Sequence, residues 1–94
     1  MALLIQGGEV VTASGQYRGD LLCEGERITR IGTDLKAPPG AEIIDAAGKY
    51  VFPGFVDPHT HIHLPVMGTR AKDTYETASK AALLGGTTCF IDFC

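Results

Sequence analysis

The order strand, helix, strand in the second half of the chain sets the narrowest limit on its fold. An apolar run begins at Phe55, an amphipathic segment spans residues 74–84, and a β-branched and aromatic run spans residues 87–93. Helical connections of this kind join parallel strands. Parallel strands normally belong to sheets of more than two strands that are covered on both faces. The 94 residues therefore predict the opening of a larger α/β protein, incomplete by itself.

The expected helix carries its own start and stop signals. Asp73 is a favourable N-cap residue and Glu76 lies three positions later, so we expect these two residues to form a capping box. Glu76 and Lys80 have the i, i+4 spacing of an ion pair on the solvent side. Gly85 and Gly86 follow the last apolar residue, which is the usual place for a helix to end.

The first half of the chain is patterned as short antiparallel strands with one solvated face. Residues 3–11 and 21–29 share the pattern Leu-Leu-x-Gln/Glu-Gly, and we predict a hairpin within each of them. Gly7-Gly8 and Gly25 would supply the positive φ that a tight turn needs. Residues 13–16 would form the loop between the two hairpins.

A change of pattern at Pro53-Gly54 divides the chain. Two further short strands, at residues 42–45 and 50–52, precede this dipeptide, and the strand-helix-strand segment follows it. We therefore expect two domains, residues 1–52 and residues 53–94.

Composition excludes several classes of partner. The chain has 8 Lys and Arg against 11 Asp and Glu, a net charge of −3, so it lacks the basic footprint of a nucleic-acid or anionic-membrane binder. No apolar run approaches the ~18 residues of a membrane span, and the N-terminus lacks the basic region of a signal peptide. Cys23, Cys89 and Cys94 form no C-x-x-C pair. We expect reduced thiols in a cytoplasmic protein, with Cys89 buried in a strand.

The chemically informative cluster is His59-Thr60-His61. Residues i and i+2 of a strand point to the same face, so both imidazoles can bind one cation at about 2.0–2.1 Å per bond. Asp57 shares their parity and is expected to accept a hydrogen bond that orients one of them. On spacing alone, a metal site and a chance pairing of histidines both remain open. Asp92 is expected to be a hydrogen-bonded structural carboxylate.

Residues 51–61 resemble the first barrel strand of the amidohydrolase superfamily, whose usual form is Pro-Gly, two hydrophobic residues and Asp-x-His-x-His. Residues 64–69 and the stretch 81–93 are similar to the hydantoinase and dihydropyrimidinase branch of that family. The resemblance implies the first two strands and the first helix of a TIM (β/α)8 barrel, preceded by part of a small β-sandwich. A complete barrel needs about 250 residues, so the chain resembles an N-terminal segment, with the sandwich in residues 1–52 and the barrel start in residues 53–94.

This resemblance also implies an activity. Hydrolases of this branch open the ring of hydantoins or dihydropyrimidines by attack of a metal hydroxide on the cyclic amide, with a binuclear site that usually holds zinc and can hold other divalent metals. His59 and His61 would hold the more buried metal, and Asp57 would orient a ligand. The substrate-entrance loop would contain four residues: His63, Leu64, Val66 and Met67.

The implied partners are a small cyclic ureide and further copies of the chain, a homotetramer in the family, with no nucleic acid and no membrane. The remaining metal ligands and the general base would lie outside these 94 residues. The segment therefore contains no catalytic residue of its own and is not expected to be active alone.

Three other interpretations remain. The first is a dihydroorotase or allantoinase, but these usually follow His-x-His with a polar residue and Glu-Pro-Gly, which residues 62–65 lack. A truncated, non-catalytic module could associate with other chains through its sheet edges. A small histidine-rich metal-binding protein is the third. Phe55, His63 and Val66 depart from the residues common in the branch, and the last two bear on substrate preference.

Overall fold

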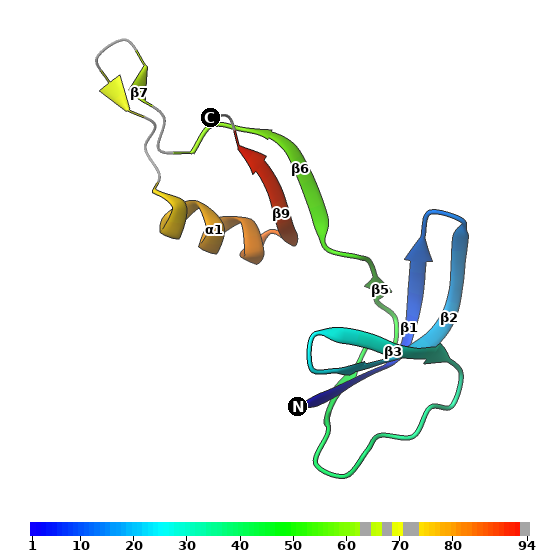
Figure 1. Ribbon diagram of the computed structural model, residues 1–94. Coiled ribbons are helices and arrows are strands. Elements are labelled where there is room, and N and C mark those ends of the chain that lie inside the picture. Colours follow the sequence, from blue (N-terminus) through cyan, green and yellow to red (C-terminus); the bar gives the residue numbers. More distant parts are fainter. Residues whose placement is uncertain (63–64, 67–68, 71–73, 93–94) are drawn as a thin grey trace. The chain divides into compact units, whose positions relative to one another are not determined.

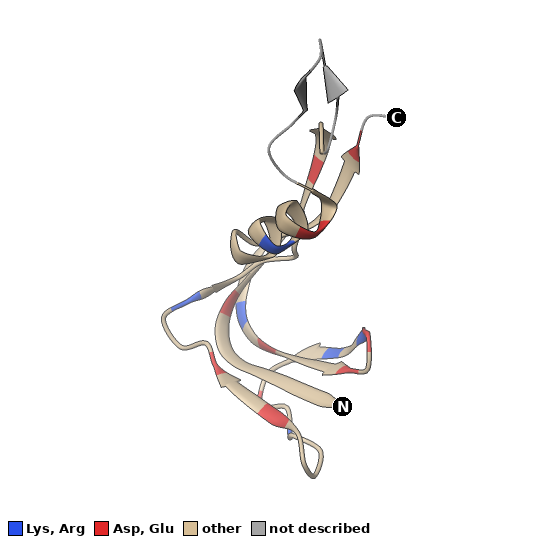
Figure 2. Ribbon diagram, turned by 90° about the vertical axis from the view of Figure 1, so that its left-hand side faces the viewer, with Lys and Arg blue, Asp and Glu red and all other residues tan. Residues whose placement is uncertain are grey.

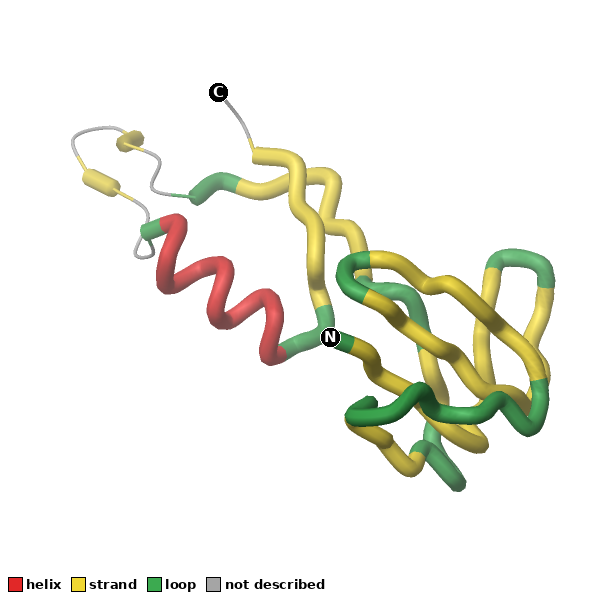
Figure 3. The backbone as a smooth tube through the Cα atoms, turned by 60° about the horizontal axis from the view of Figure 1, so that its bottom comes forward, coloured by secondary structure: helices red, strands yellow, loops and turns green. Residues whose placement is uncertain are grey.

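The computed structural model describes residues 1–62, 65–66, 69–70 and 74–92. The chain is a mixed α/β protein with two compact units, Met1–Pro53 and Gly54–Cys94. All of the described helix lies in the second unit, whereas the first is built from strands and loops (Figure 3). The division falls between Pro53 and Gly54, where the sequence pattern changes.

The first unit is a five-stranded sheet in the order β3-β2-β1-β4, with β5 also paired to β1 (Figure 1). Its strands are β1 (Ala2–Thr12), β2 (Gly15–Glu24), β3 (Arg27–Gly32), β4 (Glu42–Asp45) and β5 (Tyr50–Val51). The pairs β1–β2 and β2–β3 are antiparallel, but β4 and β5 run parallel to β1. The expectation of an antiparallel sheet is therefore wrong for two of its strands.

The predicted hairpin within residues 3–11 is also wrong. Strand β1 runs through this segment without turning and pairs with β2 on both sides of a register shift between Ile5 and Gly8. Gly7 has a φ of +71°, and its N–H donates to Asp20 Oδ1 at 2.8 Å. Gln6 and Gly7 therefore form a bulge instead of a turn, and Gly8 is back in register opposite Gly19. The hairpin predicted around Gly25 is confirmed, because β2 and β3 meet there and Gly25 has a φ of +61°.

The described core lies in the first unit. The buried apolar residues are Leu4, Val10, Leu21, Leu22 and Ala46. Asp20 is buried beside them, and its second carboxylate oxygen accepts from the Leu35 backbone N–H at 3.1 Å. The buried Asp20 carboxylate therefore hydrogen-bonds both the bulge of β1 and the segment that follows β3. In Figure 2 basic and acidic residues are interspersed along this unit, in keeping with the small net charge.

Replacing Asp20 by alanine is expected to accelerate hydrogen exchange at the Gly7 and Leu35 amides. Each amide loses a charge-assisted bond worth about 1.5–3 kcal/mol, so exchange should rise by about tenfold or more. Asp45→Ala is the matched control, because Asp45 accepts from the exposed Ala47 amide at 3.0 Å. Unchanged protection at Gly7 and Leu35 in Asp20→Ala would contradict this role.

The second unit confirms the predicted strand-helix-strand order. Strands β6 (Phe55–Thr60) and β9 (Thr87–Asp92) are parallel, and helix α1 (Tyr75–Leu84) connects them and lies beside β9 (Figure 1). The short strands β7 (Pro65–Val66) and β8 (Thr69–Arg70) pair with each other.

Glycine is required at the start of β6 by a close approach to β9. A Cβ atom on Gly54 would overlap the Thr88 side chain. The adjacent Phe55 N–H donates to the Gly86 carbonyl at 2.9 Å. The Pro-Gly dipeptide therefore lets β6 begin directly alongside the residues that enter β9.

The start of the helix and its N-cap each lie one residue later in the chain than predicted. Thr74 is the N-cap, and it forms the capping box with Thr77, whose Oγ1 accepts from the Thr74 backbone N–H at 2.9 Å. The predicted box of Asp73 and Glu76 is wrong because the Thr74 and Thr77 hydroxyls form the same reciprocal contacts; Asp73 itself lies outside the described residues. The ion pair between Glu76 and Lys80 is confirmed at 3.2 Å, as is the helix end at Gly85.

Apolar residues of the second unit remain exposed. Phe55, Val56 and Ile91 are 53%, 59% and 60% exposed, and no residue of this unit that the structure describes is buried. Cys89 is exposed as well, so its predicted burial is wrong. The reason is that, in the described part of the chain, β6 and β9 pair only with each other. Across the described ranges, no helix combines the length and apolar character needed to cross a bilayer.

Candidate metal centre

His59 and His61 lie at the carboxyl end of β6. His59 belongs to the strand and His61 follows its last residue. Their Nε2 atoms are 3.1 Å apart, and their rings meet at 62° with centroids 5.1 Å apart. Both side chains are exposed. The i, i+2 spacing therefore brings the two imidazoles together, as the sequence predicts for a shared face of a strand.

This distance has two chemical interpretations. One ring can donate an N–H to the other, or both lone pairs can turn toward a shared cation. Two nitrogens bound at about 2.0–2.1 Å in a tetrahedral arrangement lie about 3.3 Å apart, close to the observed separation. The pair therefore fits a divalent cation. Among the described residues, no cluster of three or more His, Cys, Asp or Glu side chains could hold a metal, so these imidazoles would need additional ligands.

Asp57 lies beside this pair. Its Oδ1 accepts from the backbone N–H of His59 at 3.2 Å. That bond restrains the main chain from which the His59 imidazole projects. The prediction concerned a bond to an imidazole, and it stays a prediction.

Asp92, at the end of β9, makes contacts that the sequence did not identify. Its Oδ1 accepts from the Ile62 backbone N–H at 3.1 Å, and its Oδ2 accepts from the Tyr75 hydroxyl at 2.7 Å. The expected hydrogen bonding of Asp92 is confirmed. Its partners lie 30 and 17 positions away in sequence, so no local pattern signals them.

A hollow of about 250 Å³ lies where β6 and β9 end. It is lined by Pro58, His59, Thr60, Ile91 and Asp92. The carboxyl ends of parallel strands are the edge at which α/β sheets bind ligands. The histidine pair therefore adjoins the edge of this unit where a ligand site is expected.

The predicted entrance loop is only partly described. His63, Leu64 and Met67 lie outside the described residues. Val66 belongs to β7 and pairs with Thr69 of β8, but its side chain lies outside the description. The role of this loop stays a prediction.

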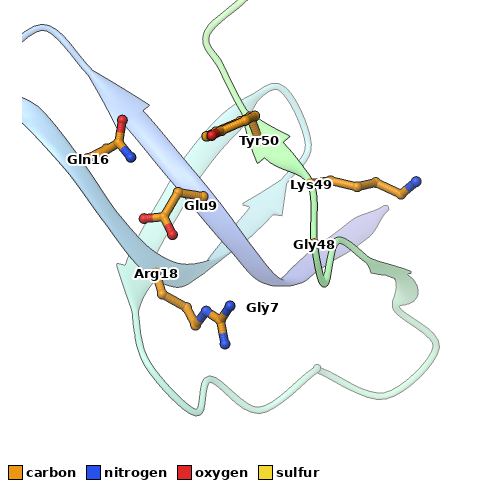
Figure 4. A pocket seen from close by; sticks show the side chains of 7 residues that line it. All are labelled: Gly7, Glu9, Gln16, Arg18, Gly48, Lys49 and Tyr50. Atoms are coloured by element: carbon orange, nitrogen blue, oxygen red, sulfur yellow. The ribbon is translucent and has the colours of Figure 1, made fainter.

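A second hollow, of about 200 Å³, lies on the first unit (Figure 4). It is lined by Gly7, Glu9, Gln16, Arg18, Gly48, Lys49 and Tyr50. Glu9 and Arg18 face each other in the register of β1 and β2, and Figure 4 shows the Lys49 side chain extending away from the other lining residues. Because the lining mixes both charge signs, it selects no ligand class.

Comparison with known proteins gives a consistent result. Residues 42–86 match the amidohydrolase family. The chain is 51% identical over all 94 residues to a D-hydantoinase of Geobacillus stearothermophilus and covers 20% of that protein. It is 42% identical over 99% of its length to dihydropyrimidinase 2 of Caenorhabditis briggsae and covers 18% of it.

The solved structures that resemble this chain include proteins with the same names as its sequence relatives. A D-hydantoinase (dihydropyrimidinase) from Thermus sp. superposes with a TM-score of 0.92 and 65% identity, over 98% of this chain and 20% of that one. The chain thus spans about one fifth of the length of the relatives it matches. The chain that carries the histidine motif and the parallel β6–β9 pair is thus similar to the amidohydrolase family over residues 42–86, and to hydantoinases and dihydropyrimidinases over nearly its whole length.

Proposed function

We propose that the chain is the N-terminal segment of a metal-dependent cyclic amidohydrolase that opens the ring of hydantoins or dihydropyrimidines. The observation that carries this proposal is the 3.1 Å separation of the His59 and His61 Nε2 atoms in a chain 51% identical to a D-hydantoinase. We refer below to the longer polypeptide that would contain this segment as the complete protein.

The two units take distinct places in this proposal. Residues 1–52 would form part of a small β-sandwich, and residues 53–94 would form the first two strands and first helix of a (β/α)8 barrel. The parallel pairing of β6 with β9 through α1 supports the barrel assignment, because a repeated strand-helix unit is what builds such a barrel.

His59 and His61 would together hold one divalent cation, and the centre is proposed to be binuclear and to contain zinc. When bound, such a centre polarises a carbonyl oxygen and lowers the pKa of a coordinated water. Both imidazoles must be neutral to bind the metal. Asp57 restrains the backbone of His59, and the loop containing His63, Leu64, Val66 and Met67 would border the substrate. The other ligands and the general base are proposed to lie outside this segment, so the segment alone would have no turnover.

The proposed partners follow from the same assignment. The substrate would be a small cyclic ureide, and the complete protein would form a homo-oligomer, a tetramer as in the family. The three separated cysteines, without a C-x-x-C pair, support a reducing cytoplasmic location.

Removing the metal from the complete protein tests the function. Ring opening of hydantoin and dihydrouracil should fall to background after chelation and dialysis, and added zinc should restore it, because the reaction depends on the metal centre. Dihydroorotate and allantoin are the comparison substrates. Turnover of these two alone would favour the dihydroorotase or allantoinase alternative, and full activity after verified metal removal would exclude the proposed mechanism.

A further inference from the structure

His61 lies just beyond the point where β6 and β9 stop pairing through their backbones. The last register pair of the two strands joins Thr60 to Asp92. His61 therefore depends on other contacts to hold its main chain in place. A metal ligand needs such restraint, because a ligand that moves freely must be ordered when the metal binds.

Side-chain bonds to β9 restrain the residues on both sides of His61. Before it, the Thr60 hydroxyl donates to the Ile91 carbonyl at 3.1 Å. After it, the Ile62 N–H donates to Asp92 Oδ1 at 3.1 Å. That N–H belongs to the planar peptide group joining His61 to Ile62, so its direction is tied to the ψ angle of His61.

The Asp92 carboxylate is itself held. Its Oδ2 accepts from the Tyr75 hydroxyl at 2.7 Å, and Tyr75 is the first residue of α1. A short bond to an ionised oxygen is among the stronger hydrogen bonds in proteins. Tyr75 therefore orients the carboxylate, and the carboxylate orients the peptide after His61.

We propose that Asp92, oriented by Tyr75, is a positioning residue for the metal ligand His61. This inference rests on the proposed metal-binding function. Asp92 acts through the His61–Ile62 peptide group, and its effect is to hold the His61 imidazole near the His59 imidazole before the metal arrives.

The test compares variants of the complete protein by two measurements: hydrogen exchange of the Ile62 amide, and zinc affinity by competition with a chelator. Asp92→Ala should accelerate exchange at Ile62 and weaken zinc binding on the order of tenfold, the scale of outer ligand-orienting contacts. Asp92→Asn keeps an oxygen that can accept from Ile62 and should recover most of the affinity. Tyr75→Phe should weaken binding less than Asp92→Ala does.

Asp45→Ala is the matched control, since it removes a carboxylate that accepts a backbone N–H in the first unit, and its zinc affinity should stay unchanged. Faster Ile62 exchange with unchanged zinc affinity in Asp92→Ala would overturn the proposal. If Asp92→Ala does not fold, the comparison of Tyr75→Phe with the parent decides, and parental zinc affinity in Tyr75→Phe overturns the proposal. His59→Ala separates the two ideas: undiminished zinc affinity there would overturn the metal site and the positioning role together.

Discussion

Complete protein carrying His59→Ala or His61→Ala is expected to lose zinc from the proposed centre and to lose ring-opening activity. The two Nε2 atoms lie 3.1 Å apart, so each substitution removes one of two adjacent donors. A metal centre supplies several kcal/mol of transition-state stabilisation, which corresponds to about 10³-fold in rate.

Metal analysis of the purified variants, together with kcat/KM for a hydantoin, checks this result. His63→Ala is the control, because it makes the same change at the third histidine, which is proposed to line the substrate entrance. That variant should keep its zinc. Parental zinc content in both the His59 and the His61 variants would remove these residues from the metal site.

The isolated 94-residue chain is expected not to unfold as a cooperative monomer. The buried apolar residues of the described chain all lie in the first unit, and the second unit leaves Phe55, Val56 and Ile91 more than half exposed. Strands with exposed apolar faces and unpaired edges recruit partners or aggregate.

Sedimentation and equilibrium unfolding in urea check this second expectation. The isolated chain should be oligomeric or insoluble, or should show a broad transition, whereas the complete protein should show a sharp one. A monodisperse 10.0 kDa species with a two-state transition would contradict it.

The repeated pattern in the first half of the chain predicts the backbone conformation of its glycines but not the structure that each glycine forms. Both Gly7 and Gly25 adopt positive φ, as their surroundings predict. Gly25 makes a hairpin turn, but Gly7 makes a bulge, because Asp20 accepts its N–H. Asp20 lies 13 positions away, so the two outcomes cannot be separated from residues 3–11 and 21–29 alone.

The N-terminus of helix α1 is a second case in which sequence preferences did not decide between two similar outcomes, here between two adjacent residues. The amphipathic pattern of residues 74–84 predicts the extent of the helix, and Gly85 and Gly86 predict its end. The N-cap is Thr74 instead of the predicted Asp73, because the Thr77 hydroxyl completes a capping box with Thr74. Several neighbouring residues with similar capping preferences leave the first residue of a helix uncertain by one or two positions.

The sequence by itself determined the order strand, helix, strand, the start of β6 at Phe55 and the proximity of His59 to His61, because each depends on a pattern within one segment of the chain. Only the tertiary structure decided that β4 and β5 run parallel to β1 and that Cys89 is exposed. It also decided that Asp92 joins Ile62 to Tyr75. These features arise from contacts between distant segments, and a carboxylate in a strand pattern carries no mark of the amide or hydroxyl that folding brings to it.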